Sequence, residues 1–211
     1  MTLSKTISLV IVGFITLSTT TVMAIEEAKY DVILKDNDVE IRHYAPHIVA
    51  EIIVTGDIEE VGNKAFTPLF DYISGQNTTQ SEIAMTAPVA QQTSGQDIAM
   101  TAPVSQQKSA SGWAVSFMMP DSYTFDTLPI PNDERIVLRQ VPSQTIVAIR
   151  YSGFWSESNY VEHKTRLENW IQQSHYQANG DAIWARYNAP FTPWFFRRNE
   201  VLIPVVDIHT K

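Results

Sequence analysis

Apolar and polar residues alternate along a segment that occurs twice in the chain. Residues 39–56 align without a gap on residues 136–153, and both contain an apolar residue before an arginine, a turn with proline, an apolar run and a closing glycine. Alternation with a period of two predicts strands. Each segment therefore predicts a strand, a turn and a second strand, and we expect two copies of one unit.

The same alternation assigns the side chains of the first copy to two faces. Ile41 and His43 share a face with other apolar residues, whereas Arg42 and Tyr44 lie on the opposite face. His43 is therefore expected to point toward the core. A histidine there needs a partner, so it is either a core residue bonded to the backbone or a ligand.

Helical periodicity follows each copy. Apolar residues recur at helical spacing after Asp57, with Pro68 expected to kink this helix or to start its second part. A second helix is expected from a cap at Asn159. Each half, about 30–120 and about 134–206, thus reads strand, strand, helix, strand, strand.

A shorter repeat lies inside the first half. EIAMTAPVAQQ at 82–92 returns as DIAMTAPVSQQ at 97–107, and the residues between them can form a hairpin turn. A repeat this short and present only twice indicates a local duplication and not a solenoid. Two near-identical strands specify register poorly, so either copy is a candidate for the framework position.

The two units together predict the fold class. A unit with one sheet and one helix buries its apolar face only by joining the other unit. We therefore predict one α+β domain over 25–211 with pseudo-two-fold symmetry, in which pairing between the halves curls the strands toward a distorted antiparallel β-barrel and removes exposed edges.

The first 24 residues have the pattern of a cleaved secretory signal. They carry a lone Lys5, an apolar run over 7–17 and a small-residue end at Ala24. The run is shorter than the ~20 residues that span a bilayer, and an uncleaved anchor is the alternative. We expect a periplasmic or secreted protein with no stable membrane insertion after cleavage.

Charge and composition exclude several classes of function. The chain has 15 basic and 23 acidic residues, and without Lys5 the net charge is −9, which argues against nucleic acid and against adsorption to anionic lipid. The absence of cysteine excludes disulfides, thiolate metal sites and a covalent haem link. No nucleotide-binding or nucleophile motif is present, and the Glu59-Glu60 pair has no companion for acid–base chemistry, so no enzyme is expected.

Several motifs resemble a known family. They are EIRHY at 40–44, YISG at 72–75, IAMTAPV at 83–89 or 98–104, Phe154 before the second helix, YNAPF at 187–191 and RRNEV at 197–201. With these motifs the chain resembles the SOUL haem-binding protein family from about residue 30 to 205. The resemblance implies a distorted antiparallel barrel with two helices, related to the effector-binding domains of bacterial multidrug-response regulators. It also implies non-covalent binding of haem or a related tetrapyrrole.

The resemblance implies two kinds of binding site. In some members a histidine at the position of His43 is the proposed axial ligand, and a neutral imidazole in an apolar wall suits haem iron. Other members hold the porphyrin in an apolar groove beside the first helix, with basic side chains near the propionates. That basic position is Lys64 here, although Thr67 stands where a groove methionine is expected. The alternative for Lys64 is a solvated surface charge.

Other candidate ligands have plain structural alternatives. Arg197 and Arg198 can pair with propionates, or form an internal ion pair with Glu200, which we favour. His163 is a rival ligand, but packing against Trp170 is the favoured interpretation. The methionines that could supply thioethers are better explained as core filling. They are Met85, Met100, Met118 and Met119.

An aromatic loop and a pair of histidines are further candidate features. Three interpretations fit the Trp194-Phe195-Phe196 loop: a lid over a ligand, a docking patch for a partner, or part of the core. We favour the core. A zinc site from His43 and His47 is disfavoured because Pro46 breaks their shared face.

The sequence thus predicts a periplasmic binder of haem or a tetrapyrrole that acts as a carrier, buffer or scavenger. The alternatives are an effector-type domain for other amphipathic molecules, with incidental haem affinity, and a protein-interaction domain that uses the aromatic loop.

Overall fold

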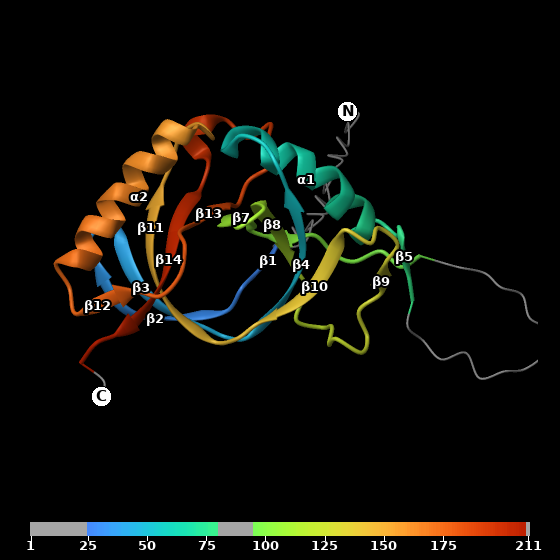
Figure 1. Ribbon diagram of the computed structural model, residues 1–211, viewed down its shortest axis with the longest axis horizontal. Helices are drawn as coiled ribbons and strands as arrows, with labels where there is room; N and C mark the ends of the chain where they lie inside the picture. The colour runs from blue at the N-terminus through green and yellow to red at the C-terminus, as the bar shows by residue number, and fades with distance from the viewer. Residues whose placement is uncertain (1–24, 80–94, 210–211) are drawn as a thin grey trace, which may run out of the picture.

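Two helices cover one face of a large, curved, antiparallel sheet in the computed structural model, which describes residues 25–79 and 95–209 (Figure 1). The helices are α1 (Ile58–Ile73) and α2 (Glu157–Gln172). The ten strands of the sheet are β2 (Tyr30–Asp36), β3 (Val39–Tyr44), β4 (His47–Val54), β7 (Val104–Ser109), β8 (Gly112–Met118), β10 (Ile136–Val141), β11 (Gln144–Tyr151), β12 (Tyr176–Ala178), β13 (Ile183–Arg186) and β14 (Asn199–Asp207).

Short elements complete the described part of the chain. A parallel pair joins the N-terminal segment to the sheet region, and an antiparallel pair closes the loop that follows α1. The elements are β1 (Glu26–Glu27) with β6 (Thr101–Ala102), β5 (Asn77–Thr78) with β9 (Ile130–Pro131), and a 3-10 helix, η1 (Trp194–Phe196).

Strand order intermixes the two predicted copies. The order is β10-β4-β8-β7-β13-β14-β11-β3-β2, with β12 also pairing with β14. β3 and β4 follow one another in the chain but do not pair with each other: β3 pairs with β11 and β4 pairs with β10. Strands of the first sequence copy therefore pair with strands of the second, while the duplication itself stays a prediction.

The sheet is open, in contrast to the expected closed barrel. β10 and β2 form its two ends, and each pairs with a single neighbour among the described strands. The sheet nevertheless curves strongly, so that the face opposite the helices is concave (Figure 1). Because of this curvature, the concave face of the sheet is an interior surface.

The core lies mainly between the helices and the convex face of the sheet. One ladder row crosses this face from strand to strand: Ile136, Ile52, Val115, Gln106, Trp184, Val201, Ile149 and Val39. All eight of these residues are buried. Gln106 is the polar exception, and it lies at the centre of the sheet, between the parts that the two helices cover.

Both helices form where periodicity predicts them, but their caps differ. Asp57 is the N-cap of α1, yet its side chain makes no cap hydrogen bond, and α1 continues through Pro68. In α2 the cap is Ser156, whose hydroxyl accepts a hydrogen bond from the Asn159 amide, so the predicted cap at Asn159 is wrong by one turn. Within the described residues, neither helix is long and apolar enough to cross a membrane.

Of the two IAMTAPV copies, the second enters the sheet. Ile98 is buried, and residues 101–104 form β6 and the start of β7. The first copy and the predicted hairpin between the copies lie outside the described residues.

Gly62 in α1 allows the first testable prediction. A Cβ built on Gly62 would lie 1.8 Å from Nη2 of Arg186, whose guanidinium group is held against the rings of Trp155 and Trp184. Gly→Ala inside a helix normally stabilises by about 1 kcal/mol. Here we expect Gly62→Ala to destabilise by about 1–3 kcal/mol, because the whole guanidinium group must move.

Urea unfolding of Gly62→Ala measures this effect, with the exposed neighbour Asn63→Ala as the matched control. Asn63→Ala is expected to leave stability unchanged or slightly higher. A Gly62→Ala protein that is more stable than the wild type would show that Arg186 is not confined.

Candidate functional site

His43 lies near the end of β3 and is exposed. Its side chain points to the same face as Val39 and Ile41, which pack under α2 with Leu167 and Ile171. The expected burial of His43 is therefore wrong, although the face is right. The strand extends beyond the part that α2 covers, so its last residue on that face is left in solvent.

His43 borders the largest of the three hollows that adjoin along the sheet, a depression of about 650 Å³. Among its described lining residues the only charged side chain is that of Asp207. The remaining lining residues are His43, Gln107, Ser143, Gln144, Thr145, Asn179, Gly180, Pro204, Val205 and Val206. The wall is more polar than the apolar wall that the sequence led us to expect.

The imidazole of His43 differs from those of the other four histidines, all of which lie in the described residues. His47 Nδ1 lies 3.1 Å from the Ala45 carbonyl oxygen. The other three make close contacts. His163 bonds to the Asn159 carbonyl and stacks on Tyr151, and His175 and His209 stack on each other. Over the described ranges, only His43 has an imidazole without a hydrogen bond or ring contact.

The three basic residues predicted as propionate partners are already engaged. Lys64 is exposed on α1 and forms an ion pair of 2.8 Å with Glu60. Arg197 donates to the carbonyl groups of Thr192 and Pro190.

Arg198 forms the internal ion pair that was favoured from the sequence. Its Nη1 donates to both carboxylate oxygens of Glu27, and its Nε lies 3.2 Å from Glu200 Oε1. Its guanidinium group also lies 3.7 Å from the centre of the Tyr187 ring. The described lining of the His43 depression contains none of Lys64, Arg197 and Arg198, so the predicted site residues do not converge there.

Glu200 is a central residue of the concave face that sequence reasoning placed only as a partner of the arginines. Its carboxylate is fully buried. Arg42 donates to it through two nitrogens, at 2.7 and 3.1 Å, and the Tyr187 hydroxyl donates at 2.8 Å. Arg42 also donates to Tyr44, at 3.1 Å. Arg42 and Tyr44 were assigned to an outer face, and they are buried because the sheet curves around them.

The network sets the ionisation of its members. Burial by itself raises the pKa of Glu200, but the hydrogen bonds and positive charge of Arg42, aided by Arg198, hold that pKa below its usual value. Burial raises the pKa of Tyr44 to about 12. The carboxylate is thus ionised and paired at neutral pH, and the tyrosine hydroxyl groups stay protonated.

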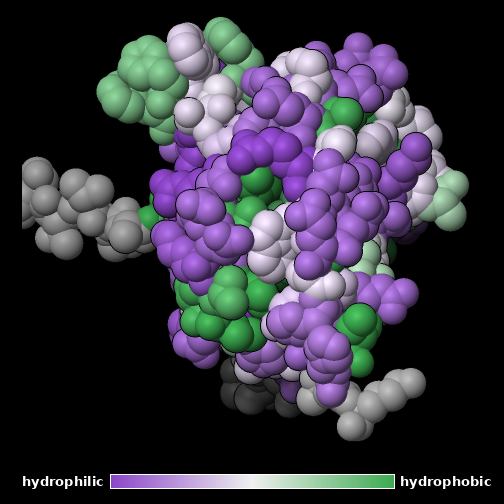
Figure 2. Space-filling model, turned by 90° about the vertical axis from the view of Figure 1, so that its left-hand side faces the viewer, coloured by the Kyte–Doolittle hydropathy of each residue, from purple (hydrophilic) through white to green (hydrophobic). Residues whose placement is uncertain are grey.

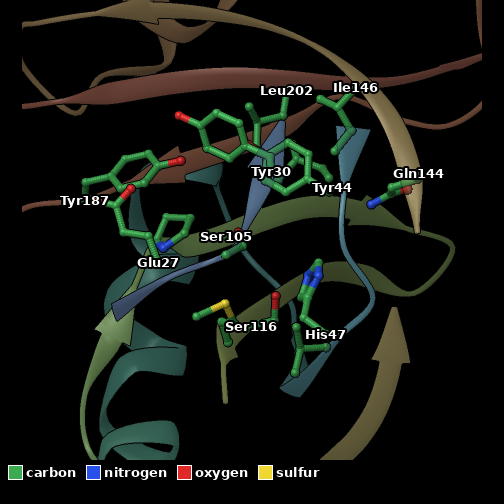
Figure 3. A pocket seen from close by; sticks show the side chains of 15 residues that line it. Glu27, Tyr30, Tyr44, His47, Ser105, Ser116, Gln144, Ile146, Tyr187 and Leu202 are labelled. Carbon is green, nitrogen blue, oxygen red and sulfur yellow. The ribbon is translucent and has the colours of Figure 1, made fainter. Parts of the chain in front are cut away.

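A small cavity lies on the same concave face (Figure 3). Figure 3 shows Tyr30, Tyr44 and Tyr187 on one side and His47 and Ser116 on the opposite side. Its volume is about 60 Å³, which suits a few water molecules and not a tetrapyrrole.

The cavity continues toward His43. A second hollow of about 170 Å³ shares His47 with the cavity, and Gln144 lines the cavity, the second hollow and the His43 depression. We call these three adjoining hollows the inner groove. It starts on the concave face beside the tyrosines and ends at the strand ends, where the His43 side chain borders it from the opposite face.

Five aromatic side chains form an exposed group, which we call the aromatic cluster: Phe154, Phe191, Trp194, Phe195 and Phe196. Phe191 is 90% exposed and Phe196 is 72% exposed, so the interpretation of this loop as core is wrong. Phe154 stacks on Trp194 with ring centres 5.2 Å apart. Figure 2 shows apolar side chains gathered at the upper edge of the face that carries α2.

The other residues considered as iron ligands pack against protein groups, are exposed, or lie outside the described residues. His163 packs on Tyr151, with ring centres 3.9 Å apart, and not on Trp170 as expected. Met118 and Met119 are buried, Met100 is exposed, and Met85 lies outside the described residues. No group of three or more metal-binding side chains occurs within 25–79 and 95–209.

Comparisons with known proteins agree with this architecture. A curved antiparallel sheet with two helices on one face occurs in solved structures such as the C-terminal domain of EcmrR (TM-score 0.52, 13% identity, 84% of this chain and 98% of that one). An uncharacterized conserved protein from Listeria innocua has the same fold (TM-score 0.58, 13% identity, 80% of this chain and 92% of that one). At these identities the likeness concerns the fold alone.

The sequence comparison defines the family. The profile described as SOUL heme-binding protein matches residues 25–204, and the chain belongs to this family. Heme-binding protein 1 of Mus musculus is 26% identical over 145 residues, which is 68% of this chain and 71% of the relative. Heme-binding protein 2 of Mus musculus is 25% identical over 183 residues, 82% of this chain and 85% of the relative.

The Glu200 network yields the second prediction. Glu200→Gln leaves Arg42 and Arg198 without their shared buried counter-charge, and we expect a loss of about 3–5 kcal/mol in the free energy of unfolding. Urea unfolding at neutral pH measures it. Glu51→Gln, which breaks the exposed ion pair with Arg139, is the control and is expected to cost less than about 1 kcal/mol.

The pH dependence identifies the carboxylate as the cause. A group whose pKa is lower in the folded state stabilises fully above its unfolded pKa, near 4.5, and this stabilisation is lost as pH falls through the folded pKa. The wild type should therefore lose stability below about pH 4.5. Glu200→Gln should lack this part of the slope, and equal slopes in the two proteins would contradict the role of Glu200.

Proposed function

We propose that this protein binds haem or a related tetrapyrrole non-covalently, with His43 as the axial ligand of the iron. The observation that carries the proposal is the free, exposed imidazole of His43 at a depression of about 650 Å³. Haem iron takes a neutral imidazole nitrogen as its ligand. Membership in the SOUL family and the names of the two murine relatives support haem as the ligand class.

The volume of the depression is compatible with a tetrapyrrole. Pockets for small molecules and cofactors have volumes of about 300–1,000 Å³, and the depression lies in this range. Pro204 and the exposed Val206 line the depression and add apolar surface to it. The lining offers no basic side chain, so the propionates are expected to point to solvent.

A second candidate function is an effector-type domain that takes another amphipathic molecule in the inner groove. The continuous hollows and the tyrosines at their closed end favour it. In this case the ligand would contact His47 and Tyr44 and would not need His43. Both candidates are binding functions, and we propose no catalytic step.

Haemin titration of the mature protein tests the ligand and the residue together. We expect a saturable one-to-one shift of the Soret band in the wild type, and binding at least about tenfold weaker, about 1.4 kcal/mol, in His43→Ala. His47→Ala is the matched control, because its imidazole lies across the same turn but lines the tyrosine cavity. Its affinity for haemin should equal that of the wild type.

Iron-free protoporphyrin distinguishes the two candidates. A ligated haem requires iron, so protoporphyrin should bind more weakly than haemin in the wild type and equally in the wild type and His43→Ala. Equal binding of both porphyrins, with a loss in His47→Ala alone, would favour the inner groove. Absence of saturable binding would refute haem as the ligand.

We also propose that the protein works in the periplasm as a carrier, buffer or scavenger, after removal of residues 1–24. The leader pattern and the acidic, cysteine-free remainder support this proposal. Expression of the full chain in a Gram-negative host, followed by fractionation and intact mass measurement, tests it. We expect a periplasmic protein that begins near Ile25. A full-length protein in the membrane fraction would indicate an uncleaved anchor instead.

A further inference from the structure

Arg186, the last residue of β13, is a buried cation without a counter-charge in the part of the chain that the structure describes. Its side chain points to the helix-covered face of the sheet, and the residue is only 7% exposed. Within 25–79 and 95–209 its guanidinium group has no hydrogen-bond or ion-pair partner. Burial lowers the pKa of Arg186 to about 10, and the only charge effect that opposes this comes from Tyr151.

The surroundings of Arg186 are aromatic and tight. The guanidinium carbon lies 5.1 Å from the ring centre of Trp155 and 5.1 Å from that of Trp184. Gly62 of α1 lies against its Nη2. Arg197 also contacts the ring of Trp155, at 4.3 Å, so two guanidinium groups share one indole. Cation–π contacts attract the cation but bring no negative charge.

Three other buried polar atoms in this part of the sheet make no hydrogen bond of good geometry, although the Trp184 indole lies close enough to Tyr151 to oppose in part the rise that burial causes in the pKa of its hydroxyl. They are Oη of Tyr151, Nε1 of Trp184 and Oε1 of Gln106, and no other described buried side-chain atom shares this state. Trp184 is two residues from Arg186 on the same face of β13, and it pairs across the ladder with Gln106. Tyr151 of β11 pairs with Asn199 of β14, and Asn199 pairs in turn with Arg186 of β13. The three residues therefore lie in one row across the sheet.

Buried polar groups in native proteins almost always have partners, so these three atoms beside an unpaired guanidinium group indicate a missing partner. The guanidinium group and the indole N–H can only donate hydrogen bonds, and the phenolic hydroxyl can also donate one. Donors and a positive charge together match an anion better than water.

The starts of both helices add to the positive potential. Gln106 Nε2 donates to the carbonyl oxygen of Ile58, the first residue of α1. The amide of Glu157, the first residue of α2, donates to the Glu59 carboxylate. Two helix N-termini therefore meet above the central strands, and helix N-termini favour negative charge. The Glu59 carboxylate is bound by the α2 amide, and within the described residues it forms no ion pair with Arg186.

We propose that Arg186, Tyr151 and Trp184 form a binding site for a small monovalent anion, such as chloride or formate, between the two helix N-termini. The close packing against Gly62 and two indole rings limits the ligand to a few atoms. The shared chemistry is a compact anion, whether inorganic or a carboxylate. The site is separate from the His43 depression, so this proposal does not depend on tetrapyrrole binding.

Thermal unfolding of the mature protein at constant ionic strength tests the proposal. Sodium chloride or sodium formate replaces sodium gluconate, whose anion is too large for the site. We expect Tm to rise and to saturate with chloride or formate in the wild type. In Arg186→Met the affinity for the anion should fall at least about tenfold, as for the loss of one partner of a buried charge pair.

The control is Arg139→Met, which removes an exposed arginine paired with Glu51 and should keep the full anion response. Tyr151→Phe provides a milder variant if Arg186→Met does not fold. Because the hydroxyl makes no hydrogen bond of good geometry without the anion, Tyr151→Phe should be about as stable as the wild type in gluconate. It should gain less from chloride or formate.

Bromide soaking of crystals locates the ion directly. Anomalous density beside Nη2 of Arg186 is the expected result. Water alone at this position, or an anion response that is equal in the wild type, Arg186→Met and Tyr151→Phe, would overturn the proposal.

Discussion

The buried carboxylate of Glu200 is the interaction on which the concave face of the sheet depends. Arg42, which is 158 residues away in the sequence, and Arg198 both pair with it, and Arg198 in turn reaches Glu27 at the N-terminal end of the described chain. One anion thus joins β14, β3 and the N-terminal segment across the curve of the sheet. Since burying an unpaired charge is far more costly than burying a paired one, the strands are held in the curvature that keeps all partners in contact.

This pairing decides which surfaces remain for a ligand. At the closed end of the inner groove Arg42 and Arg198 pair with Glu200, and burial raises the pKa values of Tyr44 and Tyr187. That end is also small, about 60 Å³. The open end, at His43, has the volume and the free imidazole. Nearer the middle of the sheet, on its helix-covered face, Arg186 is a charge without a partner among the described residues. The strand ends and the centre of the sheet therefore carry two different kinds of site.

Periodicity predicted many of the elements because both helices and most of the long strands bury one regular face. The stripe of α1 through Val61, Ala65 and Leu69 is fully buried, as its spacing indicates. The environment of His43 could not be predicted in this way. Alternation gives the face of a strand, but how far α2 extends over that face depends on tertiary packing. Curvature likewise buried Arg42 and Tyr44 on the face expected to be outside. The absence of a counter-charge near Arg186 could not be predicted from the sequence, because it depends on which carboxylates the fold brings close to it.

The central claim is that the tetrapyrrole is held at the open end of the groove by the His43 imidazole. The most direct test is NMR of protein with 15N-labelled histidine and backbone amides, titrated with gallium protoporphyrin, a diamagnetic analogue of haemin. The account predicts a large shift of the His43 ring nitrogens, with amide shifts centred on Thr145 and Val205. Shifts centred on Tyr187 and His47, or on Phe195 and Phe196, with the His43 ring unchanged, would contradict it.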